Sequence, residues 1–143
     1  MSVPRFWRRI NSLYRLEGSK CSECGKLYFP SRNRCIKCNS SNLEKHLFSG
    51  KGKIISYSWV YTPPKGFKSR IPYCLAIVEL DEGPRLTSQI AAVEENQVSI
   101  DMPIEFAFRK ISSEGEEGVI TYGFKFRPQF YPNHQKRKNK VLN

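Results

Sequence analysis

Two Cys-x-x-Cys pairs constrain the fold of this chain more than any other feature of its sequence. The first pair is Cys21 and Cys24, the second is Cys35 and Cys38, and ten residues separate them. Each pair supplies two sulfurs from one tight turn, and two such turns complete the tetrahedral shell of soft ligands that Zn²⁺ prefers. The same ligands suit iron, but zinc is the better assignment for a structural site. The sequence therefore predicts one metal ion held by four cysteines.

The predicted role of this metal site is structural. The residues after the two pairs, Gly25 and Asn39, tolerate the left-handed backbone conformation that such turns need. A closed shell of four thiolates leaves no position open for water or substrate. A thioredoxin-like redox role would require a βαβ context, which the surrounding sequence lacks. We expect the metal to stabilise a segment that is too short to bury a core of its own.

The compartment expected from the sequence is the cytoplasm. No apolar run approaches the roughly 18 residues that span a bilayer, so no membrane association is expected. The basic N-terminus lacks the continuous apolar centre and cleavage site of a secretory signal. A reducing cytosol disfavours disulfides, which agrees with metal binding by paired cysteines.

The net charge of +11 suggests nucleic acid at first, but the charge is unevenly distributed. Residues 1–20 carry +4, residues 21–45 carry +3, residues 46–128 are neutral, and residues 129–143 carry +4. A protein that binds duplex nucleic acid more often has one continuous basic face. The distribution therefore weakens the nucleic-acid interpretation without excluding it.

Residues 5–16 are predicted to form an amphipathic helix. The apolar side consists of Phe6, Trp7, Ile10, Leu13 and Tyr14, and the polar side of Arg8, Asn11, Ser12 and Arg15. Pro4 suits the first turn and Gly18 the end of the helix. The favoured interpretation is packing against the chain's own domain. The alternative is docking on a partner, because large aromatic residues and arginines are typical interface anchors.

From about residue 47 the pattern is typical of β structure, with five predicted strands. They cover KIISYSWVYT, PYCLAIVEL, RLTSQIAAV, PIEFAFRKI and VITYGFKFR, separated by Pro- and Gly-containing turns. One face of the fourth strand carries Ile104, Phe106 and Phe108, and one face of the fifth carries Ile120, Tyr122, Phe124 and Phe126. Five short strands in about 80 residues indicate a small barrel, because closure removes exposed edges.

The predicted fold class is mainly β, with an OB-fold barrel favoured over an SH3-like barrel. The expected parts are an N-terminal helix over residues 1–18, a zinc ribbon over 19–45 and a barrel over 46–130. Residues 131–143 are expected to be a disordered basic tail.

No residue pattern indicates a catalytic site. Cys74 shares a strand phase with Ala76, Val78 and Leu80, so it is predicted to be a small buried hydrophobe. The two histidines lie at the junction before the barrel and in the tail, and neither suits a base for this thiol. Phosphate-binding loops and nucleophile elbows are absent from the sequence. The chain is not expected to be an enzyme.

Two features of the predicted barrel have alternative interpretations. Tyr57, Trp59 and Tyr61 share one phase, which is favoured as the inner face of a strand, with base stacking as the alternative. The loop 63–70 lies between the first two strands, where OB-folds often bind ligands. Its cations are candidates for binding phosphate, or they are simply solvated: Lys65, Lys68 and Arg70.

The order of these motifs resembles the acyl-CoA-associated OB-fold and zinc-ribbon family, long described as a domain of unknown function and common in archaea and bacteria. The resemblance rests on FWRRINSLYRLEG, the two cysteine pairs, GKGKIISYS, PKGF, IPYCLAIVELDEGPRL and GFKFRP, and it covers residues 6–130. The chain departs from the family pattern at VSIDMPI, where Asp101 stands in place of the usual glycine.

The resemblance implies a fold, namely an OB-fold barrel that carries a rubredoxin-like zinc ribbon on a helical N-terminus, and it also implies a function. Family members occur with thiolases or hydroxymethylglutaryl-CoA synthases, as accessory or bridging subunits without catalytic residues. The expected partner is therefore a thiolase-fold enzyme, with CoA or acyl-CoA as a shared ligand near the loop cations. The expected docking residues are Phe6, Trp7, Arg8, Ile10 and Tyr14. The alternative function is binding of single-stranded RNA through the tail, the ribbon and the aromatic row of Tyr57, Trp59 and Tyr61.

Overall fold

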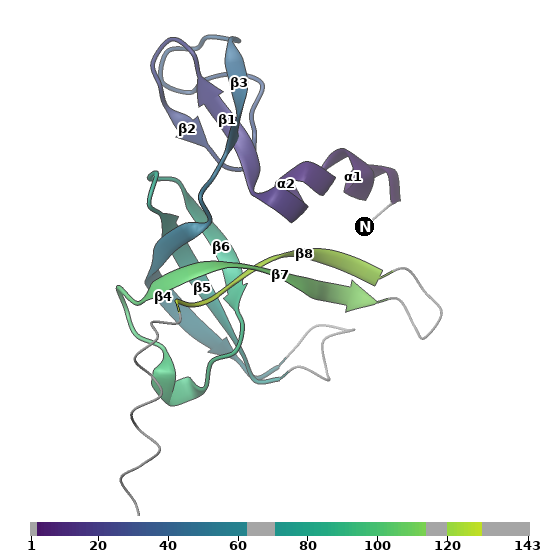
Figure 1. The fold of residues 1–143 in the computed structure, drawn as a ribbon, viewed down its shortest axis with the longest axis vertical. Coiled ribbons are helices and arrows are strands. Elements are labelled where there is room, and N and C mark those ends of the chain that lie inside the picture. Colours follow the sequence, from purple (N-terminus) through teal and green to yellow (C-terminus); the bar gives the residue numbers. More distant parts are fainter. Residues whose placement is uncertain (1–2, 63–70, 114–119, 130–143) are drawn as a thin grey trace, which may run out of the picture.

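The computed structural model describes residues 3–62, 71–113 and 120–129. Three parts follow one another along the chain: a helical segment, a small three-stranded sheet and a five-stranded barrel. Figure 1 shows the small sheet standing at one end of the barrel, with the helical segment beside their junction. None of the helices among the described residues has the length and apolar character needed to cross a membrane.

The small sheet carries the cysteine turns. Its strands are β1 (Glu17–Cys21), β2 (Leu27–Tyr28) and β3 (Leu43–Leu47), and β1 lies in the middle, antiparallel to both neighbours. The first cysteine turn joins β1 to β2, and the second lies in the long connection between β2 and β3. This arrangement is the predicted ribbon.

The barrel closes in the order β4-β5-β6-β8-β7. Its strands are β4 (Lys51–Val60), β5 (Tyr73–Leu80), β6 (Arg85–Ile90), β7 (Pro103–Ser113) and β8 (Ile120–Pro128). All pairs are antiparallel except β6 with β8, which pair in parallel at Ile90 and Phe126. The five predicted strands and the OB-fold are thereby confirmed.

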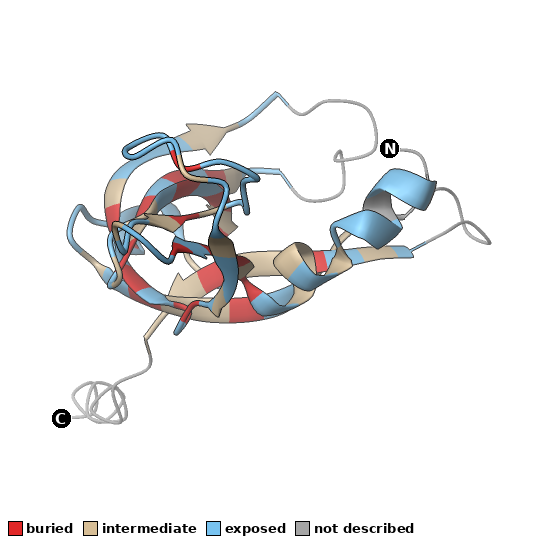
Figure 2. Cartoon of the chain, turned by 90° about the horizontal axis from the view of Figure 1, so that it is seen from above, coloured by how far each residue is buried: buried red, intermediate tan, exposed pale blue. Residues whose placement is uncertain are grey.

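The core of the barrel follows the alternation of its strands. In β5 the residues Cys74, Ala76, Val78 and Leu80 are all buried, while the residues between them face outward. Cys74 is thus a small buried hydrophobe, as predicted, and burial raises the pKa of its thiol. Figure 2 shows the buried positions as bands along the strands of the barrel.

The hairpin of β7 and β8 is buried at one end and exposed at its outer end. Ile104 and Phe126 are fully buried, but Phe108 in the same phase is 41% exposed. Tyr122 and Ile120 are exposed as well, in spite of their phase with Phe126. Residues that share one strand face are therefore not all in the core, because the hairpin extends beyond the closed part of the barrel (Figure 1).

A β-bulge in β4 decides where the aromatic row faces. The register shifts between Ile54 and Ser56, so that Tyr57 lies opposite Ala76 and Trp59 opposite Cys74. Trp59 accordingly packs against the core, as the favoured interpretation predicted. Tyr57 remains partly exposed and Tyr61 is 59% exposed, so the inner-face prediction does not hold along the whole row.

The predicted helix over residues 5–16 is interrupted. It forms α1 (Val3–Arg8) and α2 (Ile10–Arg15), and Arg9 between them leaves the helical conformation at φ −107° and ψ 6°. The left-handed residue that ends α2 is Leu16, at φ 52°, and not Gly18 as predicted. Gly18 lies in β1, where a side chain would collide with the Tyr28 carbonyl and the Phe48 ring.

Asp101, where the sequence departs from the family pattern, adopts the conformation that glycine would favour. Its φ is +61°, its backbone N–H donates to the Ile54 carbonyl at 2.8 Å, and its carboxylate lies 3.3 Å from Nζ of Lys53. Aspartate tolerates the left-handed region better than most residues, so the turn keeps its geometry. Lys65, Lys68, Arg70 and the basic tail lie outside the described residues.

Candidate metal centre and helical face

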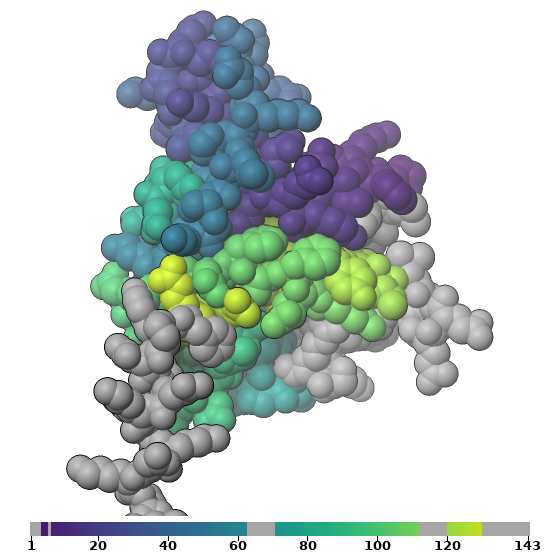
Figure 3. All heavy atoms as spheres, viewed as in Figure 1, coloured from purple at the N-terminus to yellow at the C-terminus, as the bar shows by residue number. Residues whose placement is uncertain are grey.

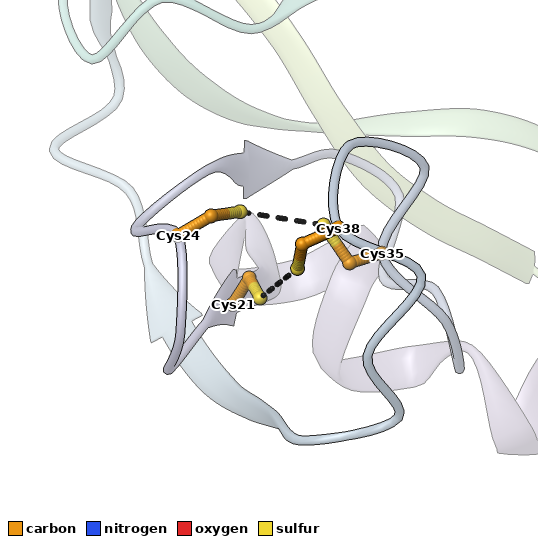
Figure 4. Close-up of side chains that lie close together, drawn as sticks. All are labelled: Cys21, Cys24, Cys35 and Cys38. Carbon is orange, nitrogen blue, oxygen red and sulfur yellow. Dashed lines mark hydrogen bonds between the residues drawn. The ribbon is translucent and has the colours of Figure 1, made fainter.

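The four cysteines of the two pairs lie together at one end of the ribbon (Figure 4). All four Sγ atoms lie within 4.8 Å of one another, with 3.5 Å between Cys21 and Cys38 and 3.4 Å between Cys24 and Cys35. Metal–sulfur bonds of about 2.3 Å in a tetrahedron separate neighbouring sulfurs by about 3.8 Å. The sulfurs therefore surround a space that suits one tetrahedral ion.

The two cysteine turns have the same backbone hydrogen bonds. In the first turn the N–H of Cys21 donates to Lys26 and the N–H of Gly25 donates back to Cys21. In the second, Cys35 donates to Ser40 and Asn39 donates back to Cys35. Gly25 and Asn39 have φ values of +70° and +60°, which confirms the left-handed positions predicted from the sequence.

Tyr28 links the metal centre to the sheet, and sequence reasoning did not identify it. Its hydroxyl lies 3.1 Å from Sγ of Cys35 and accepts a hydrogen bond from the backbone N–H of Ile36, also at 3.1 Å. The pKa of the Cys35 thiol is lowered to about 5, mainly by this hydroxyl and also by the backbone N–H of Cys38 and the neighbouring thiols, which together outweigh burial. Tyr28 is therefore an outer partner that orients a metal ligand and favours its thiolate form.

Crowding of the sulfurs raises the pKa of Cys38, in the opposite direction to the shift at Cys35. The backbone N–H of Ser40 lowers the pKa of Cys38, but the neighbouring thiols of Cys35, Cys21 and Cys24, together with partial desolvation, outweigh it and raise that pKa to about 12. Four thiolates at this spacing repel one another unless a cation lies between them. The donor set thus fits a zinc ion, which would neutralise the thiolates and tie β1 to the connection before β3.

The helical segment is attached to the barrel through α2. Tyr14 packs edge-on against Phe108 of β7, with ring centroids 4.8 Å apart, and Phe108 stacks on Tyr122 of β8 at 5.5 Å. Leu13 and Ile10 are half-buried, whereas Trp7 and Arg8 of α1 are exposed. The side chain of Phe6 lies outside the described residues. Of the predicted docking residues, Tyr14 therefore packs against the barrel and Ile10 is half-buried, whereas Trp7 and Arg8 are exposed on α1.

A groove lies where α2, the ribbon and the barrel meet. It has a volume of about 350 Å³ and continues, past Leu13, Thr87 and Phe124, into a second hollow of about 230 Å³. Phe29 and Pro30 of the ribbon and Arg9 of the helical segment form its other sides. Figure 3 shows the surface of the helical segment running above the β7–β8 hairpin.

Two family descriptions match the chain in succession. Residues 12–44 match the ChsH2 rubredoxin-like zinc ribbon domain, and residues 46–109 match the ChsH2 C-terminal OB-fold domain. The boundary between the matches, at residues 44–46, falls within β3, the last strand of the ribbon before the barrel. The zinc-ribbon assignment and the cluster of four cysteines thus agree.

Known proteins resemble the chain over most of its length. A DUF35 domain-containing scaffold protein of Methanothermobacter thermautotrophicus is 51% identical over 87% of this chain and 95% of that protein. The benzoylsuccinyl-CoA thiolase subunit BbsA of Geobacter metallireducens is 31% identical over 77% of this chain and 73% of that subunit. Among solved structures, a chain of the Ltp2-ChsH2(DUF35) aldolase has a TM-score of 0.65 and 28% identity, over 81% of this chain and 86% of that one.

Proposed function

Because the chain belongs to the DUF35 family of OB-fold and zinc-ribbon proteins, we propose that it is a non-catalytic scaffold subunit of a thiolase-type enzyme complex. The observation that carries this proposal is its similarity to the BbsA subunit and to the ChsH2 chain of an aldolase, both of which belong to larger enzymes by name. The closed set of four cysteines supports it, because such a site holds a fold rather than a substrate.

The scaffold proposal is tested by recovery of the partner. The tagged full-length chain is purified from its native extract after nuclease treatment and washes at moderate salt, and the co-purifying proteins are identified by mass spectrometry. A thiolase or hydroxymethylglutaryl-CoA synthase in near-stoichiometric amount is the expected result. Recovery of RNA-linked proteins that nuclease removes would favour the single-stranded RNA alternative and overturn the proposal.

A finer part of the proposal concerns CoA. We propose that Lys65, Lys68 and Arg70 lie near the phosphates of a CoA thioester shared with the partner enzyme. The support is the position of their loop between the first two barrel strands, where OB-folds often bind ligands, together with the absence of acidic residues in the stretch 46–70.

Replacement of these three cations by alanine tests the CoA proposal. Retention of a CoA thioester by the purified complex should fall, while recovery of the enzyme is unchanged. The matched control replaces three exposed lysines of the strands, which removes the same charge elsewhere: Lys20, Lys45 and Lys51. Equal retention in the loop variant and the control would remove CoA from the proposal and leave the scaffold function in place.

A further inference from the structure

The short helix α1 has little packing against the residues that the structure describes. Each of its side chains that the structure describes is exposed, namely Pro4, Arg5, Trp7 and Arg8. The main contacts of the helical segment with the rest of the chain are made by α2, with β8 and β1. Helices much shorter than about 12 residues are marginal in water without tertiary packing. A partner surface would supply the packing that α1 does not receive from the described residues.

The charge of α1 indicates what kind of surface this is. Arg5, Arg8 and the adjoining Arg9 are exposed, and residues 3–16 contain no acidic residue. None of these three guanidinium groups forms an ion pair with a residue that the structure describes. Guanidinium groups bind carboxylates through paired hydrogen bonds, so an acidic protein surface is complementary to this segment.

Trp7 adds an apolar anchor among the arginines. Its side chain is 65% exposed, whereas Trp59, the other tryptophan, packs against the barrel core. Tryptophan and arginine are the residues most enriched where binding energy concentrates in protein interfaces. A ring of carboxylates around an apolar pocket would match an exposed indole flanked by Arg5 and Arg8.

We propose that α1 together with Arg9 is a docking arm that binds an acidic surface of the partner enzyme, with Trp7 in an apolar pocket of that surface. This inference rests on the proposed scaffold function and names the chemistry of its contact. In Figures 1 and 2 α1 extends away from the ribbon and runs beside the protruding β7–β8 hairpin. Tyr14 and Phe108 fix the base of the arm to the barrel, so Tyr14 acts within the chain and Trp7 acts toward the partner.

The test measures binding of full-length variants to the thiolase-type enzyme that co-purifies with the wild-type chain. Trp7→Ala should weaken binding about 30-fold, as expected for loss of a central aromatic anchor. Arg8→Glu should weaken it about tenfold at low salt, with a smaller effect in about 1 M salt, where screening is strong. The matched control is Arg15→Glu, an exposed arginine in the last turn of α2, which should change binding less than about twofold.

The outcomes separate the docking arm from the scaffold function. If the wild-type chain binds the enzyme and the Trp7 and Arg8 variants bind equally well, the arm is wrong and the scaffold function stands. If Arg15→Glu weakens binding as much as Arg8→Glu, binding depends on net charge alone, and the docking-arm proposal is again wrong. If the variants lose affinity for a single-stranded RNA oligonucleotide and not for the enzyme, the proposal that α1 binds an acidic enzyme surface is wrong. If no thiolase-type enzyme is retained by the wild-type chain, both proposals fail.

Discussion

The hydroxyl of Tyr28 connects a metal ligand to the backbone of the second cysteine turn. It lies beside Sγ of Cys35 and accepts from the N–H of Ile36, while Tyr28 itself is buried. The spacing of the cysteines predicts the ligands, because Cys-x-x-Cys geometry is local to each turn. It does not predict Tyr28, because that contact depends on how the connection between β2 and β3 folds back over the sheet.

Replacement Tyr28→Phe should lower the stability of the ribbon by about 2 kcal/mol, because the Ile36 N–H and the Cys35 thiolate both lose a buried partner. Zinc should still bind with one ion per chain, since the four ligands remain. Competition with a chromophoric chelator measures the loss of zinc affinity. Unchanged affinity and unchanged thermal stability would show that the hydroxyl has no part in orienting Cys35.

Ala92 offers a second test at the residue scale. It is exposed and has φ +58°, a left-handed conformation that costs an alanine about 1–2 kcal/mol. Ala92→Gly relieves this strain but adds freedom to the unfolded chain, so the net stabilisation should be about 0.5–1 kcal/mol in urea denaturation. The matched control Ala91→Gly, at a residue without positive φ, should destabilise by a similar amount. Destabilisation by both glycines would contradict the left-handed assignment.

At the scale of elements, sequence periodicity gives the face of a strand but not what covers it. Alternation correctly predicts the buried row of β5, from Cys74 to Leu80. It does not indicate burial at the outer end of the β7–β8 hairpin, where Phe108 packs on Tyr14 of α2 and on Tyr122 instead of in a closed core. The break at Arg9 was not predictable either, because the apolar arc continues across it and only tertiary packing distinguishes α2 from α1.

The close approach of β4 and β5 depends on Gly52, a glycine with an ordinary extended backbone. A Cβ on Gly52 would overlap the Glu79 carbonyl and lie 3.1 Å from Cα of Leu80. Gly52→Ala should therefore destabilise the barrel by about 1–3 kcal/mol in urea denaturation, as overpacking does. Lys51→Ala, next to it and exposed, should change stability by less than about 0.5 kcal/mol. Equal effects of the two variants would contradict the close approach.

At the scale of the whole molecule, the ribbon and the barrel differ in what stabilises them. The barrel has a core of its own, whereas the buried cluster of the ribbon consists of Cys21, Tyr28 and Cys35 with few packed neighbours. Removal of zinc by a chelator should unfold the ribbon and leave the barrel folded. NMR amide shifts should lose dispersion for β1–β3 and keep it for β4–β8. Loss of dispersion throughout, or none at all, would contradict this separation.

The central claim is that the chain is a zinc-stabilised scaffold that works as part of a larger enzyme. Native mass spectrometry of the tagged full-length chain, purified from its own cells after nuclease treatment, tests this claim most directly. We predict an assembly whose mass equals this chain with one zinc ion plus subunits of a thiolase-type enzyme. A chain that carries no metal, or one found alone or with RNA in place of the enzyme, would contradict the account.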